Sequence, residues 1–222
     1  MATPVKANPA PLGLMGFGMT TFLLNIHNAG FYPVDAMILS MGFFYGGLAQ
    51  IIAGIMEFKN GNTFATTAFT SYGVFWWTLC WLWTFPKIFF EHKDGKFQAL
   101  AEKPDVGFIA WYLFIWGVFT LFMFFATLKK DHTIKFVFAS LATLFFLLAI
   151  RDWLDAAGLD EVKNIVGKIA GWEGIICGSS AMYYAMAQVI NGEMGRVIMP
   201  IGAPKPPVKI EATDEEREKL PV

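Results

Sequence analysis

Charged residues are scarce in this sequence, and their scarcity indicates the class of protein. Asp, Glu, Lys and Arg make up 16% of the 222 residues, whereas soluble domains carry about 25%. Hydrophobic residues make up 55%, and the few charges are clustered, so that long stretches between them have none. The net charge of −1 gives no reason to expect a nucleic-acid partner. This composition is typical of an integral membrane protein, with the lipid bilayer as its surroundings.

Cysteine and histidine are also scarce. The two cysteines, Cys80 and Cys177, lie in apolar runs and are too few for a disulfide framework. The three histidines, His27, His92 and His132, form no cluster with cysteines or carboxylates at metal-ligand spacing. The chain has no Gly-x-Ser-x-Gly nucleophile motif and no glycine-rich phosphate loop after a strand. We therefore expect neither an enzyme nor a bound metal or cofactor.

Six stretches without any charged residue predict transmembrane helices, because about 20 apolar residues span a bilayer. These stretches are residues 11–29, 36–56, 62–86, 106–128, 136–150 and 174–192. The fourth is apolar on every side, whereas a water-soluble helix would need a polar stripe. The fifth is the shortest. We therefore predict an all-α, polytopic membrane protein with six transmembrane helices.

The distribution of lysine and arginine predicts the orientation, because these residues are enriched in cytoplasmic loops. If the amino terminus is inside, ten of the 17 fall on the cytoplasmic side and seven on the outer side. We therefore expect both termini in the cytoplasm. Residues 203–222 are proline-rich and then charged, which predicts a disordered cytoplasmic tail. The charged residues 151–168 are predicted to form a separate amphipathic helix at the membrane surface.

Uncharged polar side chains are frequent within the predicted spans. At membrane depth such groups either hold helices together or line a hydrated path, and the sequence leaves both open. A path for small anions can use amide and hydroxyl donors and the amino-terminal ends of helices. The candidates for such a path are Asn8, Asn25, Gln50, Asn62, Thr63, Thr70 and Ser71. Asn8 and Asn62 are also the predicted N-caps of the first and third helices.

Proton coupling would need a side chain that titrates near neutral pH within the path. The candidates are His27, Glu57 and Glu173, and the predicted spans place each near a membrane boundary. For each, the alternative is a solvated or helix-capping charge at the edge of the membrane. Glycine pairs four residues apart, such as Gly174 and Gly178, predict close helix contacts, either within a subunit or between subunits.

Several motifs carry a family resemblance. The two longest are NPAPLGLMGFGMTTFLLNIHNAG, residues 8–30, and GNTFATTAFTSYG, residues 61–73. Shorter matches are WGVFTLFMFFATLK (116–129), FVFASL (136–141) and GRVIMPIG (195–202). Together they resemble the acetate uptake transporter family, which includes bacterial succinate–acetate permeases and fungal acetate and ammonia-export proteins.

The resemblance implies a transport domain over residues 1–202, assembled as a homo-hexamer in the inner membrane of a prokaryotic cell. This assembly is shared with proton-gated urea channels. The implied solute is acetate, succinate or a similar small carboxylate, carried by an anion channel or a proton-coupled carrier. An ammonium or other small-solute channel is the alternative. By motif, the resemblance implies a narrow hydrophobic constriction made of Phe17, Tyr72 and Leu141.

Overall fold

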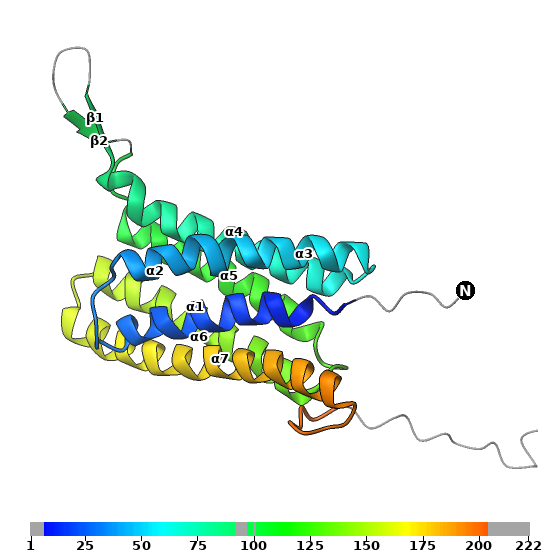
Figure 1. The fold of residues 1–222 in the computed structure, drawn as a ribbon. Helices are drawn as coiled ribbons and strands as arrows, with labels where there is room; N and C mark the ends of the chain where they lie inside the picture. Colours follow the sequence, from blue (N-terminus) through cyan, green and yellow to red (C-terminus); the bar gives the residue numbers. More distant parts are fainter. Residues whose placement is uncertain (1–6, 92–96, 100, 204–222) are drawn as a thin grey trace, which may run out of the picture.

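The structure is a computed structural model that describes residues 7–91, 97–99 and 101–203. Within this part, six long helical segments form a bundle and one short β ribbon extends from it (Figure 1). The elements are α1 (Ala10–Asn28), α2 (Ala36–Ser40), η1 (Met41–Ala49), α3 (Gln50–Lys59), α4 (Thr63–Thr84), η2 (Phe85–Lys87), β1 (Phe89–Glu91), β2 (Phe97–Ala99), α5 (Val106–Phe125), α6 (His132–Ala156) and α7 (Asp160–Met194). The predicted tail, residues 203–222, lies outside the described residues except for Ala203.

The six segments lie side by side, with α2, η1 and α3 running as one continuous helix (Figure 1). α1 begins and α7 ends at the same end of the bundle, which we call the amino end. β1 and β2 pair as an antiparallel ribbon at the opposite end, which we call the hairpin end. The sequence analysis did not predict this ribbon. α1 packs mainly against α7, α3 against α4, and α6 against both α5 and α7.

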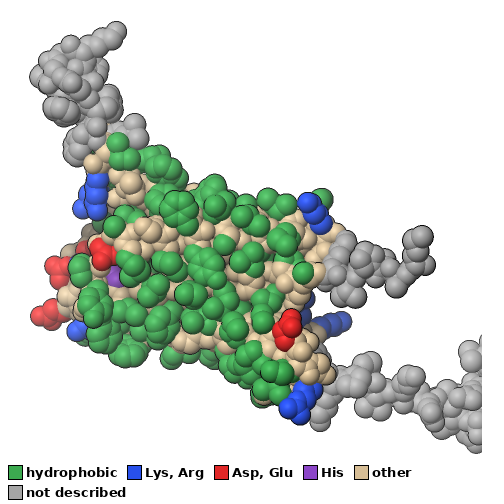
Figure 2. Space-filling model, in the orientation of Figure 1, with side chains coloured by type: hydrophobic (Ala, Val, Ile, Leu, Met, Phe, Trp, Pro, Cys, Tyr) green, Lys and Arg blue, Asp and Glu red, His purple; other side chains and the backbone are tan. Residues whose placement is uncertain are grey.

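The surface of the bundle has the pattern of a membrane protein. Hydrophobic side chains cover the middle of the face shown in Figure 2, and charged side chains gather at its two ends. Three described segments are long and apolar enough to cross a membrane: Ala36–Lys59, Val106–Phe125 and His132–Ala156, with mean hydropathies of 1.6, 2.1 and 2.2. α1, α4 and α7 contain more polar side chains, which lowers their hydropathy. The predicted helical membrane fold is confirmed at this level.

Two predictions about the last third of the chain were wrong. The predicted fifth span, residues 136–150, is only the middle of α6, which has 25 residues. The segment 151–168 forms no separate surface helix, because it is divided between the end of α6 and the beginning of the 35-residue α7. α6 continues through Arg151 and Asp152 to Ala156, and these two charged side chains form an ion pair with each other. The turn between the helices lies at Gly158, whose φ of +72° suits glycine.

Glycines allow α1 and α7 to approach closely. A Cβ atom on Gly178 of α7 would lie 2.7 Å from the carbonyl oxygen of Gly18 in α1. A Cβ atom on Gly174 would overlap the side chain of Asn25, also in α1. Real Cβ atoms do not come so close to such neighbours, so only glycine fits at these positions. These two glycines therefore serve helix packing within one subunit.

Candidate functional site

Two cavities lie inside the bundle, one toward each end. The hairpin-end cavity has a volume of about 680 Å³, and the amino-end cavity has a volume of about 210 Å³. Of the described residues, only Phe17, Tyr72 and Leu141 line both cavities. The three residues that the family resemblance singled out thus separate the two cavities, and we call them the septum.

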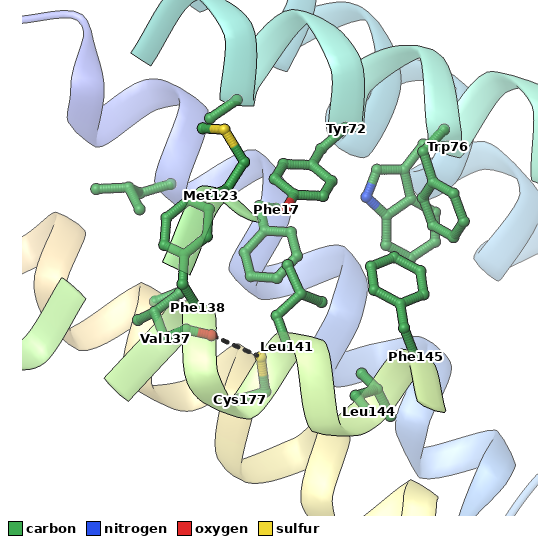
Figure 3. Close-up of a cluster of buried hydrophobic side chains, with 14 of the residues drawn as sticks. Phe17, Tyr72, Trp76, Met123, Val137, Phe138, Leu141, Leu144, Phe145 and Cys177 are labelled. Carbon is green, nitrogen blue, oxygen red and sulfur yellow. Dashed lines mark hydrogen bonds between the residues drawn. The ribbon is translucent and has the colours of Figure 1, made fainter. Parts of the chain in front are cut away.

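The septum draws one side chain from each of three helices, α1, α4 and α6. All three side chains are buried, with exposed fractions of 6% for Phe17, 3% for Tyr72 and 4% for Leu141. They point toward one another in Figure 3. The ring centroids of Phe17 and Tyr72 are 6.1 Å apart. The septum therefore presents mainly hydrocarbon between the cavities, and its one polar group is the hydroxyl of Tyr72.

The Tyr72 hydroxyl is held by a threonine that the sequence analysis did not identify. It donates a hydrogen bond of 2.9 Å to Oγ1 of Thr120, which in turn donates to the carbonyl oxygen of Trp116 at 2.7 Å. Thr120 is fully buried in α5. The Tyr72 ring also packs against Phe119, with centroids 5.6 Å apart. These contacts fix the orientation of the ring and leave the hydroxyl with an acceptor already in place.

Four of the sequence candidates line the amino-end cavity: Asn8, Gln50, Glu57 and Asn62. Glu57 is buried, with 3% exposure, and accepts a hydrogen bond of 2.9 Å from Nδ2 of Asn62. Its carboxyl group is therefore enclosed by protein, in the last turn of α3. Oδ1 of Asn62 accepts from the backbone N–H of Ala65, which confirms Asn62 as the N-cap of α4. Both polar atoms of the buried Gln50 side chain lack a partner among the described residues.

The predicted role of Asn8 as the N-cap of α1 was wrong by one residue. The N-cap is Pro9, which has no side-chain donor or acceptor to offer. Oδ1 of Asn8 still accepts a hydrogen bond from the backbone N–H of Ala10, at 3.1 Å. Its Nδ2 donates to Oε1 of Gln188 at 2.9 Å. Asn8 therefore ties the beginning of α1 to α7 at the amino end.

The hairpin-end cavity has a polar wall along α1. Asn25 donates to the carbonyl oxygen of Thr21 at 2.8 Å, and Asn28 donates to Oδ1 of Asn25 at 2.9 Å. Nη1 of Arg151 donates to Oδ1 of Asn28 at 3.2 Å, and its Nε donates to Asp152 at 2.6 Å. All five residues line the cavity. They form a hydrogen-bonded chain that leads from the mouth toward the septum.

Much of the remaining lining of this cavity is apolar. It is made of side chains from α4, α5 and α6: Phe75, Leu79, Leu113, Leu144, Phe145 and Leu148. Figure 3 shows Phe145 and Leu144 on the same side of Leu141 as Trp76. A solute with both a charged group and a short carbon chain would find a matching surface for each part.

Residues 2–203 match the sequence profile of the GPR1/FUN34/yaaH family. The chain belongs to this family. It is 53% identical over 202 residues to the succinate-acetate/proton symporter SatP of Escherichia coli strain K12, covering 91% of this chain and 98% of that protein. It is 32% identical over 197 residues to acetate permease A of Emericella nidulans, covering 88% of this chain and 65% of that protein.

Two further relatives differ in the activity that their names give. The structure of the bacterial acetate channel SatP superimposes with a TM-score of 0.80 at 52% sequence identity, covering 89% of this chain and 100% of that one. Ammonia transport outward protein 2 of Saccharomyces cerevisiae is 35% identical over 170 residues, covering 75% of this chain and 58% of that protein. The resemblance predicted from the sequence motifs is thereby confirmed.

Not every site residue predicted from the sequence lines a cavity. Thr63, Thr70 and Ser71 of α4 line neither. Thr70 instead faces α3, where its Oγ1 occupies the space that a Cβ on Gly54 would need. His27 lines the hairpin-end cavity near its mouth, and its Nδ1 lies 2.7 Å from the carbonyl oxygen of Tyr32.

Glu173 was expected at the mouth of the last helix, and this placement was wrong. α7 begins at Asp160, so Glu173 lies well inside the helix. Its Oε1 accepts a hydrogen bond from Ser140, the residue next to Leu141, while its Oε2 is enclosed without a partner among the described residues. Glu173 lines neither cavity. It therefore lies behind the septum, between α6 and α7.

Proposed function

We propose that this protein is a membrane permease for acetate and related small carboxylates such as succinate, and that the solute passes between the two cavities through the septum. The observation that carries the proposal is that Phe17, Tyr72 and Leu141 are shared by both cavities. The protein's similarity to a bacterial acetate channel, an acetate permease and a succinate-acetate/proton symporter supports it.

The septum sets the barrier in this proposal. Hydrocarbon side chains cannot replace the water around a carboxylate, so a solute must lose hydration to pass. The Tyr72 hydroxyl is the one septum donor, and a passing carboxylate receives its hydrogen bond when it displaces Thr120 as the acceptor. On the amino-end side, the cavity is lined by Gln50, whose buried amide has no partner among the described residues and can form hydrogen bonds with the solute.

Proton coupling belongs to the proposal, with Glu57 as the coupling group. It is a buried carboxyl group that lines the amino-end cavity, whereas Glu173 lines neither cavity. We expect an inward proton gradient to stimulate acetate uptake by liposomes that contain the wild-type protein, and Glu57→Gln to lose this stimulation. Glu173→Gln is the matched control and should keep it. Equal stimulation of the wild type and Glu57→Gln would remove Glu57 from the coupling step.

The proposal includes six membrane spans per protomer, a homo-hexamer, and a prokaryotic inner membrane with both termini in the cytoplasm. Large hydrophobic side chains exposed on α5, such as Phe108, Ile115 and Phe122, support contact with lipid or with another subunit. The amino-end cavity would then face the cytoplasm. Labelling of a cysteine placed near either end in intact cells would test the orientation.

An ammonium path is the alternative, because one relative is named for ammonia transport. Purified protein in liposomes separates the two candidates. We expect uptake of labelled acetate that excess succinate suppresses and excess ammonium does not. Suppression by ammonium alone, or no acetate uptake at all, would overturn the carboxylate proposal.

A further inference from the structure

The middle of α7 lies behind the septum and lines neither cavity. The α7 residues that border the hairpin-end cavity end at Lys168, and those that border the amino-end cavity begin at Tyr184. The stretch between them, residues 169–183, packs against α1 and α6, the helices that carry Phe17 and Leu141. This stretch is therefore placed to set the distance between two of the three septum side chains.

The contact of this stretch with α1 is a direct contact of backbones. A Cβ atom on Gly171 would lie 2.1 Å from the backbone nitrogen of Ala29, which follows the last residue of α1. A Cβ atom on Gly178 would lie 2.7 Å from the carbonyl oxygen of Gly18, the residue after Phe17. Helices whose backbones already touch cannot move closer together. α7 therefore gives Phe17 a fixed support.

The contact with α6 is made by two polar side chains, one turn apart on α7. Ser140, the residue before Leu141, donates a hydrogen bond to Oε1 of Glu173. Sγ of Cys177 donates to the carbonyl oxygen of Val137 at 3.8 Å (Figure 3). In an α-helix this carbonyl also accepts from the backbone N–H of Leu141, four residues further on. Glu173 and Cys177 thus hold the turn of α6 that carries Leu141.

A carboxyl group is a costly choice for a contact between two apolar helices. Oε2 of Glu173 is enclosed and has no hydrogen-bond partner among the described residues. Enclosing such a group lowers stability unless its hydrogen bonds offset the lost hydration. Within the described part of the chain, the bond from Ser140 is the hydrogen bond that this carboxyl group makes. The purpose of Glu173 is therefore to be found in what that bond holds in place.

We propose that Glu173 is a positioning residue that sets the width of the septum. Through Ser140 it holds the turn of α6 that carries Leu141 at a fixed distance from Phe17. The inference rests on the proposed function, because the width matters to transport only if solutes cross the septum. It adds a determinant of solute size that touches no solute. The role needs an acceptor oxygen at position 173 and no charge, so glutamine can replace glutamate there.

The first experiment measures uptake of labelled lactate and labelled acetate by liposomes that contain the full chain. The ratio of the two uptakes does not depend on how much of the protein is folded. Ser140→Ala and Glu173→Leu each remove the bond, so α6 can move away from α1. The lactate-to-acetate ratio should then rise about threefold or more, the scale of one lost hydrogen bond. Glu173→Gln keeps an acceptor and should keep the wild-type ratio.

Thr143→Val is the matched control on α6. Oγ1 of Thr143 donates to the carbonyl oxygen of Ala139 in its own helix, at 3.0 Å, so its loss should leave the ratio unchanged. The double variant Ser140→Ala/Glu173→Leu should have the ratio of either single variant, because each removes the same bond. Wild-type ratios in both single variants would overturn the positioning role. A rise in Glu173→Gln as large as that in Glu173→Leu would overturn it as well.

A second measurement reports the width of the septum without transport. In the variant Phe17→Cys/Leu141→Cys, bifunctional thiol reagents of increasing length should link the two positions, while the native Cys80 and Cys177 are buried. Adding Ser140→Ala should shift efficient linking to a longer reagent, and the same preferred length in both proteins would overturn the role. Absence of acetate uptake in the wild type would overturn the proposed function alone, since the linking result still decides how Leu141 is held.

Discussion

The hydroxyl of Tyr72 separates two physical contributions of the septum, bulk and hydrogen bonding. Tyr72→Phe keeps the ring and removes the group that donates to Thr120. A hydrogen bond to a charged group contributes about 1.5–3 kcal/mol, so we expect acetate flux to fall about tenfold or more with unchanged selectivity. Thr120→Val is the control, since it frees the hydroxyl without removing it, and flux should not fall. Equal acetate flux in wild type and Tyr72→Phe would show that the hydroxyl does not meet the solute.

Leu141 tests the bulk of the septum. Leu141→Ala removes side-chain volume where the two cavities meet, so succinate or lactate flux should rise relative to acetate flux. The change should also lower the free energy of unfolding by about 2–5 kcal/mol, as for other buried leucines. Leu144 is equally buried, at 4%, but lines only the hairpin-end cavity. Leu144→Ala should therefore cost similar stability and leave selectivity unchanged; a similar selectivity change in both variants would contradict the septum.

The sequence predicted the individual site residues unevenly. Phe17 and Leu141 came from the family resemblance, because an apolar residue in an apolar helix carries no other signal. Thr120 was detectable from the sequence, since it is one of the few polar side chains in α5, a helix with a mean hydropathy of 2.1. Arg151 was missed as a cavity residue because the predicted fifth span ended just before it. Its position depends on contacts with Asn28, which is far away in sequence.

At the scale of elements, the contact between α1 and α7 depends on glycine. Gly178→Ala would place a Cβ atom 2.7 Å from the Gly18 carbonyl oxygen, which must push the helices apart. We expect a lower melting temperature in detergent. Gly192→Ala on the same helix has nothing within 4 Å of the new Cβ atom, and alanine favours helix, so its melting temperature should stay or rise. Equal melting temperatures of the two variants would contradict the assigned packing.

Helix boundaries were predictable where a capping side chain marks the beginning of a helix and not elsewhere. Asp35 and Asn62 begin helices as N-caps, and their side chains accept from backbone N–H groups. The charges between 151 and 168 do not mark an interruption of the same kind, since several are paired, Arg151 with Asp152 within α6 and Lys163 of α7 with Asp155 of α6. The length of a charge-free stretch alone cannot show whether the charge that bounds it is paired within a continuing helix or solvated at a helix end.

At the scale of the whole molecule, both cavities and the septum belong to a single chain. A hexamer of such chains would contain six independent paths. Leu141→Trp should block the path of its own protomer by filling the septum. When wild-type and Leu141→Trp chains are mixed before reconstitution, acetate flux should therefore fall linearly with the fraction of blocked chains. Native mass measurement in mild detergent should give six copies for every mixture. A decline steeper than linear would mean that neighbouring subunits share a path or must move together, and a mass of one or two copies would exclude the hexamer.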